Sequence, residues 1–450
     1  MRNLILAIVI IASIINPVYS QWSGVYFQDD ANRFDAGFGM TWIDNQAYHT
    51  FTLQPDLHFG KLGVGLDVQL LLHSGTSKFR SQDWNTASDW VRMIRYLRWG
   101  QKGDRFYIRI GALDLERLGH GFILNYYNNQ QYYDERKLGL MLDLDFGHFG
   151  FESMANNLGR LEVIGGRGYY RPFYQNKNPV LRNLAFGASY VTDLDPDSRC
   201  NTENSIGIWG IDVEMPVLKT DILQMMLYAD HAQILDYGNG QTIGLRTDIN
   251  LLAGFLRMGV TLERRFLGSE FVPAYFGPFY EVLRYSTLGE LQEYYESQGG
   301  NPEGIPDELS SELQSTQVEQ QQLLPMFAKN RKGWYAGLGL DFLHLVRLFG
   351  FYQTIDNAAG SGLLHLGAEL SPAISFLIME ASYDKRGLDQ LGDIWTLDYR
   401  SIARIGLGYK IYSDVYFYLD YIWGYTWDSN LGQYKPQERF QPRLALRFTF

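Results

Sequence analysis

The last thirteen residues of the chain alternate between apolar and polar side chains. The apolar series contains Phe440, Leu444, Leu446, Phe448 and Phe450, and the polar series contains Arg439, Arg443 and Arg447. A period of two predicts a β-strand with one apolar and one polar face. Arginines cannot lie in a dry interior without partners, so the polar face must meet water and the apolar face must be covered by something else.

The same alternation recurs along the chain in runs of about ten residues, the length that a tilted strand needs to cross a bilayer. Such runs include 64–72, 105–112, 137–146, 243–251, 334–342 and 415–423, and the first one covers 33–43. Apolar faces outside and polar faces inside predict an all-β fold, a closed antiparallel transmembrane β-barrel. We expect 18 to 20 strands. Two candidates, 149–155 and 160–171, are weak, the second because Arg167 interrupts its apolar face; 20 strands become 18 without this hairpin, and 16 is a further possibility.

The connections between these runs alternate between short turns and long polar segments, as in outer-membrane barrels. The longest, 268–332, changes period. Leu283, Leu288 and Leu291 are spaced for a short amphipathic helix, and a second helix is expected to begin near Pro306. We expect a long, partly helical external loop. This loop either folds into or over the pore mouth, or lies on the outside of the barrel without a role at the pore.

Residues 1–20 have the pattern of a secretory signal peptide, with Arg2, an apolar stretch over 4–15 and a cleavage site before Gln21. Residues 21–450 are then expected to form a single domain without an N-terminal plug. Cys200 is the only cysteine, so no intrachain disulfide forms. The net charge of −11 tells against nucleic acid as a partner.

A terminal aromatic residue that closes an alternating strand, here Phe450, resembles the last strand of Gram-negative outer-membrane β-barrel proteins, which include the porins. The resemblance is to this class only. It implies that the protein lies in the outer membrane, among lipid and lipopolysaccharide, and that the barrel assembly machinery reads Phe450.

Charged residues on the polar faces are the candidates for a pore lining. They are Arg92, Arg98, Arg105, Arg109, Asp143, Asp145, Asp212, Glu214, Arg246, Asp248, Arg400, Arg404, Arg439, Arg443 and Arg447. A basic wall opposite an acidic wall would set a transverse field across a water-filled channel. Replacing Arg105 and Arg109 by Gln should then change ion selectivity. Alternatively, the charges pair across the lumen and fill it.

The segment 114–135 is rich in amides and tyrosines, which suit a constriction, contacts to sugar or protein, or packing inside the lumen. Its candidates are His120, Asn125, Tyr126, Tyr127, Asn128 and Asn129. A further segment spaces three aspartates like a calcium loop, at Asp193, Asp195 and Asp197. It lacks the turn glycine, so a solvated acidic loop is favoured.

The sequence carries no nucleophile elbow, zinc motif or phosphate-binding loop, and therefore predicts no enzyme, no cofactor and no metal site. Asp230 and His231 are adjacent, but neighbouring strand residues point to opposite faces. We therefore expect a porin-like channel for passive diffusion of small hydrophilic solutes. The alternative is a barrel closed by its loops that displays them to a polysaccharide or a partner protein. The solute and the oligomeric state stay open.

Overall fold

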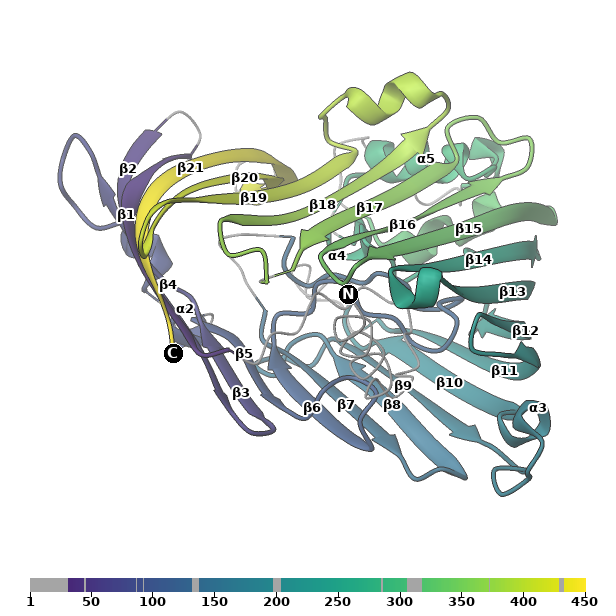
Figure 1. Ribbon diagram of the computed structural model, residues 1–450. Coiled ribbons are helices and arrows are strands. Elements are labelled where there is room, and N and C mark those ends of the chain that lie inside the picture. Colours follow the sequence, from purple (N-terminus) through teal and green to yellow (C-terminus); the bar gives the residue numbers. More distant parts are fainter. Residues whose placement is uncertain are drawn as a thin grey trace.

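The chain forms one antiparallel β-sheet that closes on itself (Figure 1). The computed structural model describes residues 31–450 except 44–45, 86, 92, 132–136, 197–203, 285, 306–317, 372 and 429–432. Closure comes from β1 (Arg33–Ile43), which pairs with both β2 (Gln46–Phe59) and the last strand, β21 (Gln433–Thr449). The sheet therefore has no open edge, which is the condition for a sheet to lie in lipid.

The remaining strands follow one another around the barrel, each antiparallel to its neighbours. The first half contains β3 (Leu62–Leu66), β4 (Val68–His73), β5 (Ile94–Trp99), β6 (Phe106–Gly111), β7 (Gly139–Asp145), β8 (Phe149–Ala155), β9 (Val163–Tyr170), β10 (Ala185–Asp193) and β11 (Ile206–Lys219). The second half contains β12 (Leu223–Ile234), β13 (Asn239–Leu251), β14 (Leu256–Leu267), β15 (Arg331–Phe342), β16 (Val346–Ile355), β17 (Gly362–Leu370), β18 (Leu377–Leu388), β19 (Ser401–Tyr412) and β20 (Val415–Asp428).

The strand count agrees with the upper end of the expected range. Strands β3 and β4 both pair with β2 and are separated only by Asp67, so they are one interrupted strand in a 21-stranded sheet, which makes twenty crossings. The count of 16 is wrong. Both weak candidates form strands, β8 and β9, and Arg167 points into the barrel, where it is buried.

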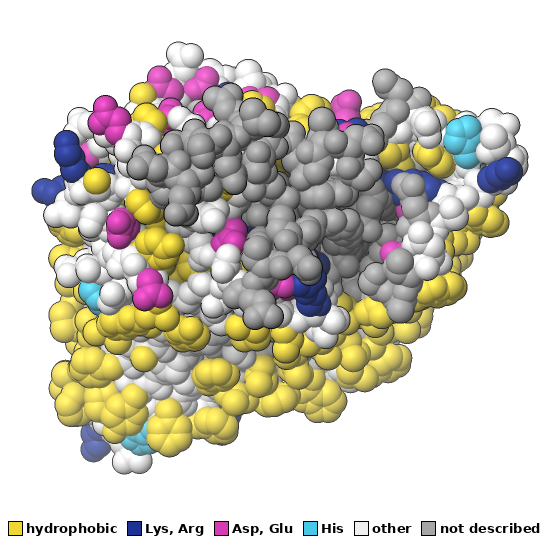
Figure 2. All heavy atoms as spheres, turned by 180° about the vertical axis from the view of Figure 1, so that it is seen from behind, with side chains coloured by type: hydrophobic (Ala, Val, Ile, Leu, Met, Phe, Trp, Pro, Cys, Tyr) yellow, Lys and Arg dark blue, Asp and Glu magenta, His cyan; other side chains and the backbone are white. Residues whose placement is uncertain are grey.

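Alternate residues of the strands point outward and form an apolar belt, seen as a yellow band in Figure 2. On the closing strand Phe440, Leu444, Leu446 and Phe448 are exposed, whereas Arg439 and Arg443 are buried inside. Arg447 also points inward, where its Nε donates to Asp35 at 2.7 Å. The predicted orientation of the two faces is confirmed: apolar side chains lie outside and charged ones inside.

Short helices lie in the connections. They are η1 (Ser81–Asp83), α2 (Ala87–Val91), α3 (Pro179–Arg182), η2 (Leu252–Gly254), α4 (Tyr280–Leu283), α5 (Leu288–Ser297), η3 (Pro302–Gly304), η4 (Gln320–Met326) and η5 (Leu391–Trp395). None of the helices in the described ranges is long and apolar enough to span a bilayer. The helix expected near Pro306 lies outside the described residues. Helices α4 and α5 lie where the first amphipathic helix, with Leu283, Leu288 and Leu291, was expected.

Two connections turn inward rather than outward. We call them inner loop A (112–131) and inner loop B (268–330). Their apolar side chains join those of the strand interiors in one buried core, with Leu124, Phe276 and Leu291 fully buried. The described residues of inner loop B therefore fold into the barrel, which is one of the two alternatives expected for this long loop.

The barrel is sharply curved on the side formed by β19, β20, β21, β1 and β2 (Figure 1). Gln69 on β4 donates a hydrogen bond of 2.9 Å to Gln441 on β21, although β2 and β1 lie between these strands. Glutamine side chains can meet across two intervening strands only where the wall bends tightly. The barrel thus has a wide side, which holds the inner loops, and a narrow polar side.

Candidate functional site in the barrel lumen

The inner loops are joined to each other by backbone hydrogen bonds. Leu124 and Phe276 form a parallel β-bridge. The amide of Asn125 donates to the carbonyl of Phe276 at 3.1 Å, and the amide of Ala274 donates to Phe122 at 2.8 Å. Because these groups satisfy each other inside the barrel, the two loops form one body.

A buried ionic clamp fastens inner loop B to the wall. Glu281 of α4 accepts from Lys137 at 2.8 Å, and Arg284 reaches Glu162 at 3.1 Å and Asp193 at 3.1 Å. Burial alone would raise the pKa of Glu281, but Lys137 and Arg284 lower it to about 2. Asp193 is fully buried, so it is not part of a solvated acidic loop. Asp197, the third aspartate of the calcium-loop-like spacing, lies outside the described residues.

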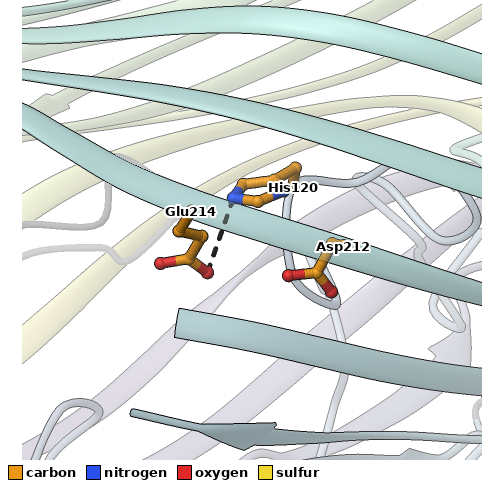
Figure 3. A group of neighbouring side chains, drawn as sticks. All are labelled: His120, Asp212 and Glu214. Carbon is orange, nitrogen blue, oxygen red and sulfur yellow. Dashed lines mark ion pairs between the residues drawn. The ribbon is translucent and has the colours of Figure 1, made fainter. Parts of the chain in front are cut away.

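The tip of inner loop A places His120 against the strand wall (Figure 3). Its ring stacks on Tyr228 with centroids 3.9 Å apart. Its Nδ1 lies 3.0 Å from Asp230, and its Nε2 lies 3.5 Å from Glu214. Burial lowers the pKa of an imidazole, but Asp230 and Glu214 outweigh burial and raise the pKa of His120 to about 10. His120 is therefore a cation that anchors the loop.

The tip can make this approach because glycines flank His120. Gly119 and Gly121 both have positive φ, 55° and 86°. A Cβ on Gly119 would lie 2.9 Å from Arg167. Only glycine combines this backbone conformation with so close an approach.

His120, Asp212 and Glu214 lie close enough together to hold a metal ion. Arg167 already occupies the carboxylates, however. Its Nε and Nη2 lie 2.9 and 2.7 Å from Asp212, and Nη2 lies 2.6 Å from Glu214. The guanidinium supplies the positive charge that a metal would bring, so the group is an ion-pair network.

Two of the buried histidines, His120 and His365, have rings within hydrogen-bond distance of an aspartate. The ring of His365 on β17 lies 2.7 Å from Asp384, as the ring of His120 lies beside Asp230. Within the described residues, no serine or cysteine hydrogen-bonds to either ring. His231 points away from Asp230 and lies beside Trp209, as the strand period predicted.

On the narrow side, a bulge in β5 turns Arg95 into the barrel. Gly65 pairs with Tyr96 and Leu66 with Ile94, so Arg95 is the extra residue. Its Nη2 lies 2.5 Å from Asp56, which also accepts from the hydroxyl of Tyr96. Bulges re-aim side chains in this way. In a regular strand Arg95, three positions from the inward-facing Arg98, would point to the lipid. The alternation in the sequence therefore did not identify Arg95 as a lining residue.

Charged residues of the opposite wall face Arg95. Glu380 on β18 is within electrostatic range of Arg95 and Arg404, and of Asp114 at the start of inner loop A. Arg404 lies 3.8 Å from Asp114, and Asp420 on β20 lies 3.2 Å from Arg443. From β5 to β18 the wall runs through β3, β2, β1, β21, β20 and β19. Groups this far apart around the sheet meet only where the lumen is narrow. We call this group the constriction (Arg95, Asp114, Glu380, Arg404 and Asp420).

The constriction is hollow. The Arg95 and Arg404 side chains are 43% and 35% exposed, that of Asp420 is 30% exposed, and Glu380 is exposed as well. All four point into a closed barrel, so their exposed surface must face a space inside it. Solvent reaches them there, whereas the core around the inner loops is dry.

Most of the predicted lining residues face the interior next to an opposite charge. These pairs are Arg404 with Asp114, Arg443 with Asp420, Arg447 with Asp35, Asp145 with Arg171, Asp212 and Glu214 with Arg167, Arg246 with Asp248, and Arg400 with Asp398. At these positions each charge therefore has a counter-charge beside it. Their role as a pore lining stays a prediction.

The other predicted lining residues lie in several different surroundings. Arg98 is buried and donates to the carbonyl of Gly100, and Arg439 donates to Gln437. Arg109 points inward, with its guanidinium 5.8 Å from the ring of Tyr96. Asp143 on β7 lies near Lys102, and Arg105 is exposed in the turn before β6. Arg92 lies outside the described residues.

The candidates on inner loop A are all buried: His120, Asn125, Tyr126, Tyr127, Asn128 and Asn129. Tyr127 donates to Glu281 of inner loop B. Asn129 accepts from the amide of Leu113 at 2.9 Å and donates to the carbonyl of Asn156 at 2.7 Å. Of the alternatives for this segment, the structure has the loop packed inside the lumen.

A closed antiparallel sheet with an apolar exterior and a charged interior defines an outer-membrane β-barrel protein, of the class found in Gram-negative bacteria. No family model matches the sequence, and no curated protein matches it.

Solved structures that share the fold include three with low sequence identity. CdiB from Acinetobacter baumannii has 7% identity and a TM-score of 0.27, over 94% of this chain and 60% of that protein, so this chain spans less than two thirds of its length. The ferric enterobactin receptor PfeA of Pseudomonas aeruginosa has 10% identity and a TM-score of 0.36, over 93% and 82%. The outer membrane protein OpdK of the same organism has 10% identity and a TM-score of 0.31, over 94% and 100%. These scores carry no argument about function.

Proposed function

We propose that this protein is an outer-membrane channel through which small hydrophilic solutes diffuse along the narrow side of the barrel. The observation that carries the proposal is the exposure of charged side chains inside a closed sheet, above all Arg95 at 43% and Glu380. Ionised groups keep such surface only where water reaches them. Inner loops A and B close the wide side, so the passage is limited to the space around the constriction.

In this proposal the protein has the same surroundings as other outer-membrane β-barrel proteins. The apolar belt faces lipid, with lipopolysaccharide at the outer surface. Phe450, which is 73% exposed beyond the end of β21, is free to be read by the assembly machinery.

Swelling of liposomes tests the channel. Liposomes that hold the folded protein are diluted into isotonic solutions of sugars of increasing size. We expect fast swelling for small sugars and progressively slower swelling for larger ones, because the constriction limits the passage. Protein-free liposomes and liposomes with heat-unfolded protein are the controls. Swelling at the control rate with every sugar, from protein shown to be folded by its heat-modifiable migration, would contradict the proposal.

The second candidate function is a closed barrel that displays its loops to a polysaccharide or a protein. The observation that favours it is the buried core of the inner loops, which fills the wide side. If the passage on the narrow side does not conduct, this candidate remains. The swelling assay therefore separates the two.

A further inference from the structure

Glu380 differs from the other charged residues of the constriction. Arg95 is bound to Asp56, Arg404 lies beside Asp114, and Arg443 lies beside Asp420. In the described part of the chain, no hydrogen bond or ion pair reaches the carboxylate of Glu380. Each of these three arginines has an acid beside it, Asp56 being shared with Arg33, and Glu380 is a carboxylate of the constriction without such a partner.

The side chain of Glu380 points into the barrel, as the alternation of side chains along β18 shows. Two residues before it, Ile378 packs on Tyr416 and Tyr418 inside the barrel. Four residues after it, Asp384 binds the buried His365. Because side chains on a strand alternate, Glu380 shares this inner face. Its carboxylate is exposed there, so it lies in the water-filled space and not in a dry contact.

The sheet leaves room next to Glu380. Glu380 is paired with Gly406, and Gly406 with Asp420, so the three form a row across β18, β19 and β20. A Cβ on Gly406 would have Asp420 at 3.2 Å and the Glu380 backbone at 3.8 Å as its nearest neighbours. The missing side chain leaves space over Gly406, which is bordered by the Asp420 carboxylate and the Glu380 backbone.

We propose that Glu380 makes the passage selective for solutes that carry a positively charged nitrogen, such as primary ammonium groups. This inference rests on the proposed channel function. An unmatched carboxylate at the narrowest point attracts cations and repels anions without removing their water, because it acts through a short aqueous distance. Arg95, Arg404 and Arg443 contribute little repulsion, since each of them already faces an acid. A neutral sugar gains nothing from this charge.

Planar bilayers under a salt gradient test the inference. The reversal potential is measured with potassium chloride and with methylammonium chloride for the full chain and for Glu380→Gln. We expect the native channel to prefer the cation in both salts. Glu380→Gln should lower the cation-to-anion permeability ratio roughly 25-fold, because one unit charge at about 4 Å in water favours a cation about fivefold and disfavours an anion about fivefold. Glu380→Asp should retain most of the preference, because it keeps the charge.

Glu303→Gln is the matched control, since Glu303 is an exposed residue of η3 and the chemical change is the same. It should leave the reversal potential unchanged. A conducting Glu380→Gln channel with the native reversal potential, or a native channel that prefers chloride, would overturn the inference and leave the channel itself standing. A folded native barrel that never conducts would instead overturn the proposed function.

Discussion

His120 carries a carboxylate at each ring nitrogen, Asp230 at 3.0 Å and Glu214 at 3.5 Å. The amide- and tyrosine-rich segment 114–135 drew attention to it in the sequence. Its partners could not be predicted, because they lie on strands far along the chain, and only the closure of the barrel brings them to the loop. Parity did place Asp230 and His231 on opposite faces, and this part of the reasoning is confirmed.

The pH dependence of the loop anchor follows from His120. Its folded-state pKa of about 10 lies above the usual 6.5. The anchor therefore contributes fully below about pH 6.5, and its contribution is lost as the pH rises through about 10. We expect subtilisin to cut inner loop A faster at pH 10.5 than at pH 8.

In His120→Gln the loop should be cut faster at both pH values, since about 1–3 kcal/mol of charged hydrogen bonding is gone. The matched control is His344→Gln, whose ring is bound to Asp341 in the turn after β15. It should behave like the native chain. A native chain with the same cutting rate at both pH values would contradict the role of His120.

Among the elements, the strands were predictable and the inner loops were not. Alternation located strands such as β20 and β21 because one face of each meets lipid along its whole length. It failed at β5, where the extra residue of a bulge reverses the side on which Arg95 lies. The direction of inner loop B depends on contacts such as that between Arg284 and Asp193, which sequence periodicity does not contain.

The ionic clamp of inner loop B gives a prediction for Glu281→Gln. The substitution leaves Lys137 and Arg284 short of one buried negative charge, which costs about 3–5 kcal/mol when a buried pair is broken. Inner loop B should then be cut faster by protease at neutral pH, and the conductance should rise because the wide side opens. Glu303→Gln should change neither quantity.

In the native chain, acid should make inner loop B easier to cut only at very low pH. The pKa of Glu281 is lowered to about 2 from about 4.5, so the clamp is fully present above about pH 4.5 and is lost as the pH falls through about 2. Fast cutting of the loop already at pH 5, or a Glu281→Gln chain as resistant as the native one, would contradict the clamp.

For the whole molecule, composition and pattern were sufficient for the class of fold. Polar faces that include Arg443 and Arg447 need an interior with water and counter-charges, and an apolar outer face needs lipid, so a closed barrel satisfies both. The state of the lumen could not be predicted in this way. It depends on where inner loops A and B lie and on the curvature that brings Gln69 to Gln441, and both are properties of the closed sheet.

The central claim is that water and solutes cross the barrel beside the row of Glu380, Gly406 and Asp420. Single-channel conductance of the native chain and of Gly406→Leu tests it most directly, because the added side chain would occupy the space over Gly406 once the Asp420 carboxylate, 3.2 Å from the new Cβ, has shifted. Gly392→Leu, in the exposed η5 where nothing lies within 4 Å, is the control. We predict discrete conductance steps for the native chain and the control, and clearly smaller steps for Gly406→Leu. A folded native barrel without steps, or full-sized steps in Gly406→Leu, would contradict the claim.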